Sequence, residues 1–169
     1  MNAYETLHFA VGDSKLGAVI AATSDKGVAA ILIADDADRA MRELRNAFPD
    51  VTLAEDRSLA GAAVEAATRL VDAPQRGFDL PLDLRGSELE LAVWQALRAI
   101  PVGETRSYGA LAKALPVPAT AQEVGAACAA NRVAVAVPCH RVVKADGGIS
   151  GYRWGVARKQ QLIDMERAT

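Results

Sequence analysis

Cysteine and histidine are both scarce in this 169-residue sequence, which has two of each. The two cysteines, Cys128 and Cys139, are too few for a disulfide framework and suit a reducing cytosol, so we expect a cytoplasmic protein. They lack Cys-x-x-Cys spacing, and the only histidines are His8 and His140, which argues against a structural zinc site. We therefore expect neither a metal ion nor a cofactor.

Long apolar runs are absent as well. Although 51% of the residues are hydrophobic, their runs are short and interrupted by charges, so no membrane span is predicted. The N-terminus, MNAYETLHFAVGDSKL, has neither a basic flank nor a long apolar segment, and we expect no secretory signal. With 24% charged residues and no low-complexity tract, the composition is that of a globular protein that can bury a core.

An excess of positive charge is also missing, because the formal net charge is −2. The charges are unevenly distributed, however. Residues 1–86 contain 9 Lys+Arg and 14 Asp+Glu, whereas residues 87–169 contain 10 and 7. Two explanations of this asymmetry are open: random scatter of the charges, or a C-terminal half that binds a polyanion.

Turn residues divide the first half of the chain into short elements. Three strands are predicted between residues 7 and 34, because Gly and Asp clusters separate the apolar runs. Asp35 or Asp36 can cap a helix through about Phe48, and a second helix is predicted over 58–71. The Pro- and Gly-containing stretch 73–86 is typical of a linker. We therefore expect an N-terminal sheet-and-helix domain with its linker over 1–86 and a second domain over 87–169.

The second half is predicted to be mainly helical. Ser87 and Glu90 have the spacing of a capping box, and a helix with one apolar face follows them. Ser107 can cap a short helix over 108–115, and a second capping box at Thr120 and Glu123 opens a helix through 131. Two short helices joined by a proline-marked turn form a helix-turn-helix candidate. The small side chains of the second helix suit either close packing or a DNA groove.

The segment VAVAVPCHRVVK, residues 133–144, interrupts an alternating apolar run with a proline and then places Cys139 beside His140. A free thiol has a pKa of about 8.5, so reactivity at neutral pH requires a basic or cationic neighbour. A third group must orient the imidazole, and Asp146, Asp164 and Glu166 are the downstream carboxylates. From these residue types alone, a reactive and a structural Cys139 are equally supported.

The segments PCHRVV, GGISGYRWGVARKQQLIDMERAT and LPLDLRGSELELAVWQALRAIPVGETRSYGALAKAL resemble the O6-alkylguanine-DNA alkyltransferases, also called methylated-DNA–protein-cysteine methyltransferases. The likeness is in particular to the C-terminal repair domain of the bacterial Ada adaptive-response protein. It implies an α/β fold: a small antiparallel sheet with helices, ribonuclease H-like, followed by a mainly helical domain with a helix-turn-helix. It also implies a monomer that binds double-stranded DNA containing alkylated guanine, with no obligate protein partner and no membrane.

The implied reaction is DNA repair by one irreversible transfer of an alkyl group from O6 of a flipped-out guanine to the protein's own cysteine. The resemblance makes Cys139 the nucleophile and lets His140 take the thiol proton through a water. Glu166 would orient the imidazole, and Tyr108 would pass a proton to N3 of the leaving guanine. Asn131 would tie the recognition helix to the active-site strand.

The same resemblance assigns the remaining site residues. The expected pocket wall is Val142, Tyr152, Arg153 and Trp154. The expected DNA-binding residues are Thr120, Ala121, Gln122, Gly125 and Ala129.

Two departures from the family pattern and two further residues bear on the site. Gln122 stands where the family usually has an arginine that enters the duplex, and no cysteine precedes Cys128, so no N-terminal zinc site is expected. Arg141 can form an internal ion pair or contact phosphate, and Cys128 is expected to be a packing thiol. A non-catalytic lesion binder and one domain of a larger regulator stay open as alternatives to a repair alkyltransferase.

Overall fold

The computed structural model describes residues 5–168, and the chain forms two compact units. The first contains the residues up to Asp72, together with Arg76–Leu84 and Arg132–Ala136. The second contains Ala73–Gln75, Arg85–Asn131 and the residues from Val137 onward. Local sequence patterns gave no sign that a five-residue segment from the second half of the chain belongs to the first unit.

The first unit is built on a four-stranded sheet with the order β3-β2-β1-β4. Strands β1 (Thr6–Ser14), β2 (Gly17–Thr23) and β3 (Val28–Ala34) pair antiparallel, which confirms the three predicted strands. Strand β4 (Thr52–Glu55) was not predicted, and it pairs parallel with β1. The sheet is therefore mixed, with an antiparallel core of three strands.

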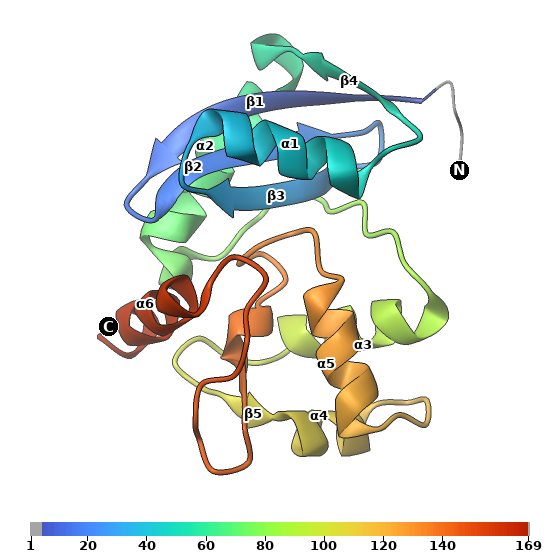
Figure 1. The fold of residues 1–169 in the computed structure, drawn as a ribbon, viewed down its shortest axis with the longest axis vertical. Coiled ribbons are helices and arrows are strands. Elements are labelled where there is room, and N and C mark those ends of the chain that lie inside the picture. The colour runs from blue at the N-terminus through green and yellow to red at the C-terminus, as the bar shows by residue number, and fades with distance from the viewer. Residues whose placement is uncertain (1–4, 169) are drawn as a thin grey trace. The chain divides into compact units, whose positions relative to one another are not determined.

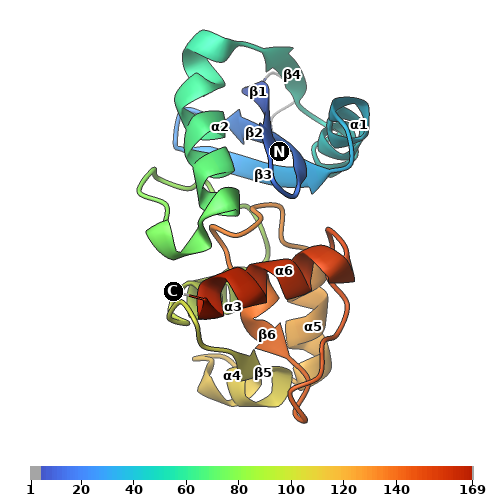
Figure 2. The same cartoon turned by 90° about the vertical axis from the view of Figure 1, so that its left-hand side faces the viewer.

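Two helices cover opposite faces of this sheet (Figure 2). Helix α1 (Ala37–Ala47) begins at Asp36, whose side chain accepts a hydrogen bond from the backbone N–H of Arg39 at 2.8 Å. Helix α2 (Arg57–Asp72) packs mainly on β1 and β2, with small and branched residues on its buried side. Both helices lie within a few residues of their predicted bounds, because each carries a local start signal and one apolar face.

The stretch predicted as a linker contributes to the sheet edge. The backbone N–H of Val28 donates to the carbonyl of Pro81 at 2.8 Å, and the N–H of Asp83 donates to the carbonyl of Val28 at 2.8 Å. Gly27 permits this approach, because a Cβ there would lie 2.4 Å from the carbonyl oxygen of Pro81. A short 3-10 turn, η1 (Pro74–Arg76), precedes this segment.

The segment Arg132–Ala136 also pairs with β3, through Ile31. The N–H of Ile31 donates to the carbonyl of Arg132, and the N–H of Ala134 donates to the carbonyl of Ile31, both at 2.9 Å. The alternating apolar run then turns at Val135, where φ is 67°. A β-branched residue rarely adopts this conformation, so the turn is held by the surrounding contacts rather than favoured by the local sequence.

The second unit is mainly helical (Figure 1). Helix α3 (Glu88–Arg98) starts with the predicted Ser87–Glu90 capping box, and its buried Trp94 donates an indole N–H to the carbonyl of Ala127 at 2.9 Å. Trp94 is thus a core residue that joins α3 to the next helix pair. A small parallel pair, β5 (Arg106–Ser107) and β6 (Val142–Val143), lies in the same unit.

The helix-turn-helix consists of α4 (Tyr108–Ala114) and α5 (Ala121–Ala129), which pack against each other. Ser107 caps α4, and a capping box of Thr120 and Glu123 opens α5, so both predicted starts are confirmed. Helix α6 (Val156–Arg167) was not predicted, because its many polar residues hide its buried side. No helix among residues 5–168 has the length and apolar character needed to cross a membrane.

Candidate active site

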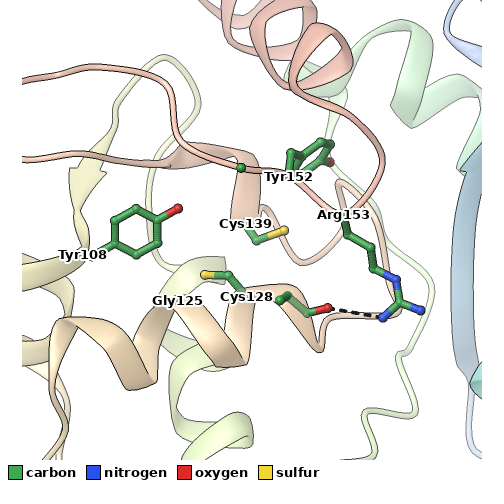
Figure 3. Close-up of a pocket in the computed structure, with 8 residues that line it drawn as sticks. Tyr108, Gly125, Cys128, Cys139, Tyr152 and Arg153 are labelled. Carbon is green, nitrogen blue, oxygen red and sulfur yellow. Dashed lines mark hydrogen bonds between the residues drawn. The ribbon is translucent and has the colours of Figure 1, made fainter.

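A cavity of about 380 Å³ opens in the second unit and has the size of a small-molecule site (Figure 3). Its lining residues come from α4, α5, the turn after β6 and the segment around Pro138. They are Tyr108, Gly125, Cys128, Ala129, Cys139, Gly151, Tyr152 and Arg153. The cavity therefore brings together residues from the helix-turn-helix and from the C-terminal part of the chain.

Pro138 sets the position of Cys139 at this cavity. The proline has φ −83° and ψ 64°, and the N–H of Cys139 donates to the carbonyl of Val137 at 2.8 Å, which closes an inverse γ-turn. A short 3-10 helix, η2 (Cys139–Arg141), follows directly. This turn directs the sulfur of Cys139 toward the cavity (Figure 3).

Asn131 links the end of α5 to this turn. It is buried, and its side-chain amide donates to the carbonyl of Val137 at 2.9 Å and to the Sγ of Cys139 at 3.4 Å. Burial raises the pKa of Cys139 to about 11, although the hydrogen bond from Asn131 favours the thiolate. The resting thiol is thus protonated at neutral pH and requires a base to become a nucleophile.

His140, Arg141 and Glu166 form a buried cluster beside Cys139. The Nε2 of His140 lies 2.8 Å from Oε2 of Glu166, and Arg141 donates to both carboxylate oxygens at 2.8–3.2 Å. Arg141 also donates to the carbonyl of Ile100 at 2.7 Å. Of the two roles predicted for Arg141, the structure therefore shows the internal ion pair. Glu166, on α6, is held from two sides.

The charge state of the cluster follows from these contacts. Burial opposes ionisation of Glu166, but hydrogen bonds from His140 and Arg141 outweigh it and lower the pKa to about 2. Burial lowers the pKa of His140, so its imidazole is neutral at pH 7. With Nε2–H donating to an ionised Glu166, Nδ1 carries a lone pair, and this atom has no hydrogen-bond partner within residues 5–168. His140 is therefore arranged as a base.

Tyr108, the first residue of α4, presents its hydroxyl to the cavity (Figure 3). The hydroxyl forms a short hydrogen bond with Ser150. Burial raises the pKa of Tyr108 above its usual value, so the phenol remains protonated and can act as a proton donor.

The residues expected at the pocket wall occupy two layers. Tyr152 and Arg153 line the cavity, and Arg153 donates to the carbonyls of Ala129 at 3.4 Å and Asn131 at 3.2 Å at the end of α5. Trp154 is buried behind Tyr152, with its ring edge-on at a centroid distance of 5.3 Å. Val142 is fully buried and pairs with Arg106, so it also supports the wall from behind.

The expected DNA-binding residues lie along α5. Thr120 is its N-cap, and Ala121 and Gln122 are exposed in its first turn. Gly125 and Ala129, one and two turns further, line the cavity. The exposed start of the helix and the cavity wall therefore belong to one continuous element.

Comparison with known proteins identifies the family. A model of the 6-O-methylguanine DNA methyltransferase DNA-binding domain matches residues 88–168. The chain is 41% identical over 124 residues to the inducible methylated-DNA–protein-cysteine methyltransferase of Bacillus subtilis, covering 73% of this chain and 69% of that protein. The chain belongs to the methylated-DNA–protein-cysteine methyltransferase family.

Further relatives extend the match over nearly the whole chain. It is 44% identical over 164 residues to the bifunctional transcriptional activator/DNA repair enzyme Ada of Escherichia coli, covering 95% of this chain and 45% of that protein. The chain thus spans less than half the length of this relative. The structure of Mycobacterium tuberculosis OGT in complex with DNA matches with a TM-score of 0.76 and 32% identity, covering 95% of this chain and 93% of that chain.

Three residues that the site prediction did not include lie at or close to the cavity. Cys128 is buried and lines the cavity, and burial raises its pKa to about 12. Ser150 bonds to Tyr108, and Lys159 of α6 is fully buried and donates to Ser150 at 3.0 Å. The sequence gave no signal for Ser150 or Lys159. Ser150 lies in a loop, and Lys159 lies on α6, whose sequence has no clear apolar pattern.

Proposed function

We propose that this chain repairs alkylated DNA by a single, irreversible transfer of an alkyl group from O6 of guanine to Sγ of Cys139. The observation that carries the proposal is the position of Cys139, a buried thiol that faces a base-sized cavity and lies beside a neutral, oriented histidine. The names of the relatives from B. subtilis and E. coli, a methyltransferase acting through cysteine and a DNA repair enzyme, support the same chemistry.

The residues of the cavity have complementary roles in this reaction. His140 takes the thiol proton at Nδ1 through one water, while the Glu166 carboxylate holds the ring and stabilises the imidazolium that forms. Asn131 donates to the developing thiolate. The sulfur attacks the alkyl carbon, the bond from that carbon to O6 breaks, and Tyr108 gives a proton to N3. The guanine leaves as a neutral base, which is easier than departure as an anion.

Binding of double-stranded DNA uses α5. A helix with small side chains and an exposed first turn can lie in a groove, and Gly125 and Ala129 connect that surface to the cavity. A damaged guanine extruded from the duplex would enter the cavity between Tyr108 and Tyr152. The free thiols of Cys128 and Cys139 fit a reducing compartment, so we place this activity in the cytoplasm.

The decisive experiment distinguishes a repair enzyme from a protein that binds the lesion without reacting. Gln122 in place of the usual arginine would favour the second alternative. The protein is incubated with duplex DNA containing one O6-methylguanine and then measured as intact protein and as peptides by mass spectrometry. We expect one added methyl group, located on Cys139. Tight binding to the lesion without added mass would identify a lesion binder instead.

A further inference from the structure

Lys159 is the largest fully buried side chain in the described part of the protein. Lysine is rarely buried unless it is paired with an acid. Within residues 5–168, however, the side-chain ammonium donates only to neutral oxygens, Ser150 Oγ at 3.0 Å and the carbonyl of Gly151 at 3.4 Å. Its position against the cavity wall has no role in the chemistry described above, and a merely structural purpose would be met by an apolar side chain.

Lys159, Ser150 and Tyr108 form a chain of hydrogen bonds that ends in the cavity. The Nζ of Lys159 bonds to Ser150, and Ser150 bonds to the hydroxyl of Tyr108. The same Nζ lies 5.9 Å from the centroid of the Tyr108 ring. The buried end of the chain is therefore a cation, and the cavity end is the proposed proton donor.

The donor and acceptor properties of these groups give the chain a direction. A lysine ammonium has donors only, so the Ser150 oxygen must accept from Lys159. The Ser150 hydroxyl hydrogen is then available to the oxygen of Tyr108. The phenolic hydrogen of Tyr108 is in turn left to point away from Ser150, toward the cavity that it lines. Each bond orients the next donor toward the substrate.

We propose that Lys159 and Ser150 are positioning residues that orient Tyr108 and resupply its proton while the alkylated base departs. This role rests on the proposed function. As the sulfur–carbon bond forms and the carbon–O6 bond breaks, the electron pair passes into the purine and N3 takes the proton of Tyr108. Tyr108 recovers a proton from Ser150, and Ser150 recovers one from Lys159. Lys159 becomes a neutral amine, which solvent protonates afterwards.

The electrostatics of the cavity favour this sequence of events. Burial lowers the pKa of Lys159, whereas negative charge on Cys139 raises it. In the other direction, positive charge on Lys159 favours the thiolate of Cys139. When the thiolate becomes a neutral thioether, its support for a charged Lys159 is lost, and burial, the largest influence on the pKa of the amine, meets less opposition. The proton of Lys159 is thus released most easily at the moment when the departing base requires it.

The experiment is a comparison of variants on two substrates that differ in the atom receiving the proton. Single-turnover methyl transfer is measured at saturating protein, on duplexes containing either O6-methylguanine or its 3-deaza analogue, which has carbon in place of N3. The variants are Ser150→Ala, which breaks the chain, and Ser150→Thr, which retains a hydroxyl. Lys159→Met removes the buried cation, and Lys144→Met removes an exposed lysine from the preceding loop as a matched control.

We expect Ser150→Ala and Lys159→Met to slow transfer from O6-methylguanine at least about tenfold, because each weakens the proton donation by Tyr108 without removing Tyr108 itself. On the 3-deaza substrate, which cannot accept the proton, both variants should match the wild type. Ser150→Thr should restore most of the rate, and Lys144→Met should have no effect on either substrate.

Equal slowing on both substrates would assign Ser150 and Lys159 a purely structural role, and no slowing on either would also overturn the relay. If Lys159→Met does not fold, Ser150→Ala alone decides the question, because its partners remain in place. Methylation of Cys139 in the wild type shows that the proposed function holds whichever way the variants behave, whereas a wild type that transfers nothing refutes the function itself.

Discussion

At the scale of single residues, the proposed nucleophile Cys139 is an unreactive, protonated thiol in the resting protein. Its thiol is buried, has a pKa raised to about 11 and accepts a hydrogen bond from Asn131, and in the proposed function His140 activates it. A protonated, enclosed thiol reacts slowly with electrophiles that diffuse through the cell. In the proposed function the nucleophile is used once, so a slow resting thiol is an advantage: it becomes reactive when a base occupies the cavity and His140 accepts the proton.

Replacing Cys139 by alanine tests the identity of the nucleophile. We expect Cys139→Ala to remove all methyl transfer while folding and DNA affinity remain within about twofold of the wild type, because within residues 5–168 the Sγ accepts one long hydrogen bond, from Asn131. Cys128→Ala is the matched control, since Cys128 is the second thiol of the same cavity and should be dispensable. A methyl group found on Cys128 of the treated wild type would contradict the assignment.

Glu166 is expected to affect both the chemistry and the stability of the fold. Glu166→Gln preserves the shape but cannot stabilise a charged His140, so transfer should slow more than DNA binding weakens. It also leaves the buried Arg141 without its carboxylate, which should lower the free energy of unfolding by about 3 kcal/mol. Single-turnover rates and urea unfolding measure the two effects. An unchanged rate at saturating protein would remove Glu166 from the catalytic network.

At the scale of elements, α5 connects the exposed surface of the helix-turn-helix to the cavity. Its start is fixed by the Thr120 capping box, and its end is held by Asn131 and by the contacts of Arg153 with its last carbonyls. Cationic groups at a helix C-terminus are favourable because they complement the helix dipole. Anchored at both ends, α5 can hold Gln122 and the cavity wall in a fixed relation to each other.

Gln122 lies in the exposed first turn of α5, where the family usually has an arginine. Opening a stacked base pair costs a few kcal/mol, and a side chain that fills the vacated space offsets part of this. Glutamine is shorter and uncharged, so we expect Gln122→Arg to accelerate transfer from duplex DNA more than from single strands, where little stacking is lost. Single-turnover rates of both proteins on both substrates measure the difference.

Equal acceleration on both substrates, or none on the duplex, would show that another side chain takes the place of the base. Lys113, exposed on α4, is one candidate. Arg132 is less suited, because its guanidinium stacks over the ring of Phe48 in the first unit at 5.2 Å from the ring centroid.

At the scale of the whole molecule, buried ionisable groups make the folded state sensitive to acid. The folded-state pKa of Glu166 is about 2 against an ordinary value of 4.5, so its contribution to stability is complete above pH 4.5 and is lost as the pH falls toward 2. The pKa of His140 is lowered from 6.5, so its neutral form also favours the fold above that pH, and this contribution declines below it.

We therefore expect the free energy of unfolding to decrease as the pH falls from 7 to 3. Urea titrations at several pH values measure the decrease, and the same series on Glu166→Gln isolates the carboxylate. The difference in the free energy of unfolding between the two proteins should shrink by on the order of 2 kcal/mol below pH 4.5, because the variant has no carboxylate at position 166 to protonate. A constant difference over this range would show that Glu166 is not ionised in the folded protein.

The sequence by itself determined what depends on neighbours within a few residues. The starts of α1, α3, α4 and α5 were predictable because each cap is a hydrogen bond between residues three positions apart. The helix-turn-helix followed from these starts and from the prolines between them. The residue types of the Pro-Cys-His-Arg-Val motif left a reactive and a structural Cys139 equally supported, and only the resemblance to a family proposed Cys139 as nucleophile and Glu166 as the group that orients His140.

The tertiary structure alone decided what depends on contacts between distant segments. The pairing of Arg132–Ala136 with β3, the parallel β4 and the turn at Val135 have no local signal, because long-range hydrogen bonds hold them. Helix α6 has a largely polar sequence, so its pattern did not mark Lys159 as buried or Glu166 as a partner of His140 and Arg141. Propensity and periodicity describe one segment at a time, whereas a buried charge is stable only where other segments supply its partners.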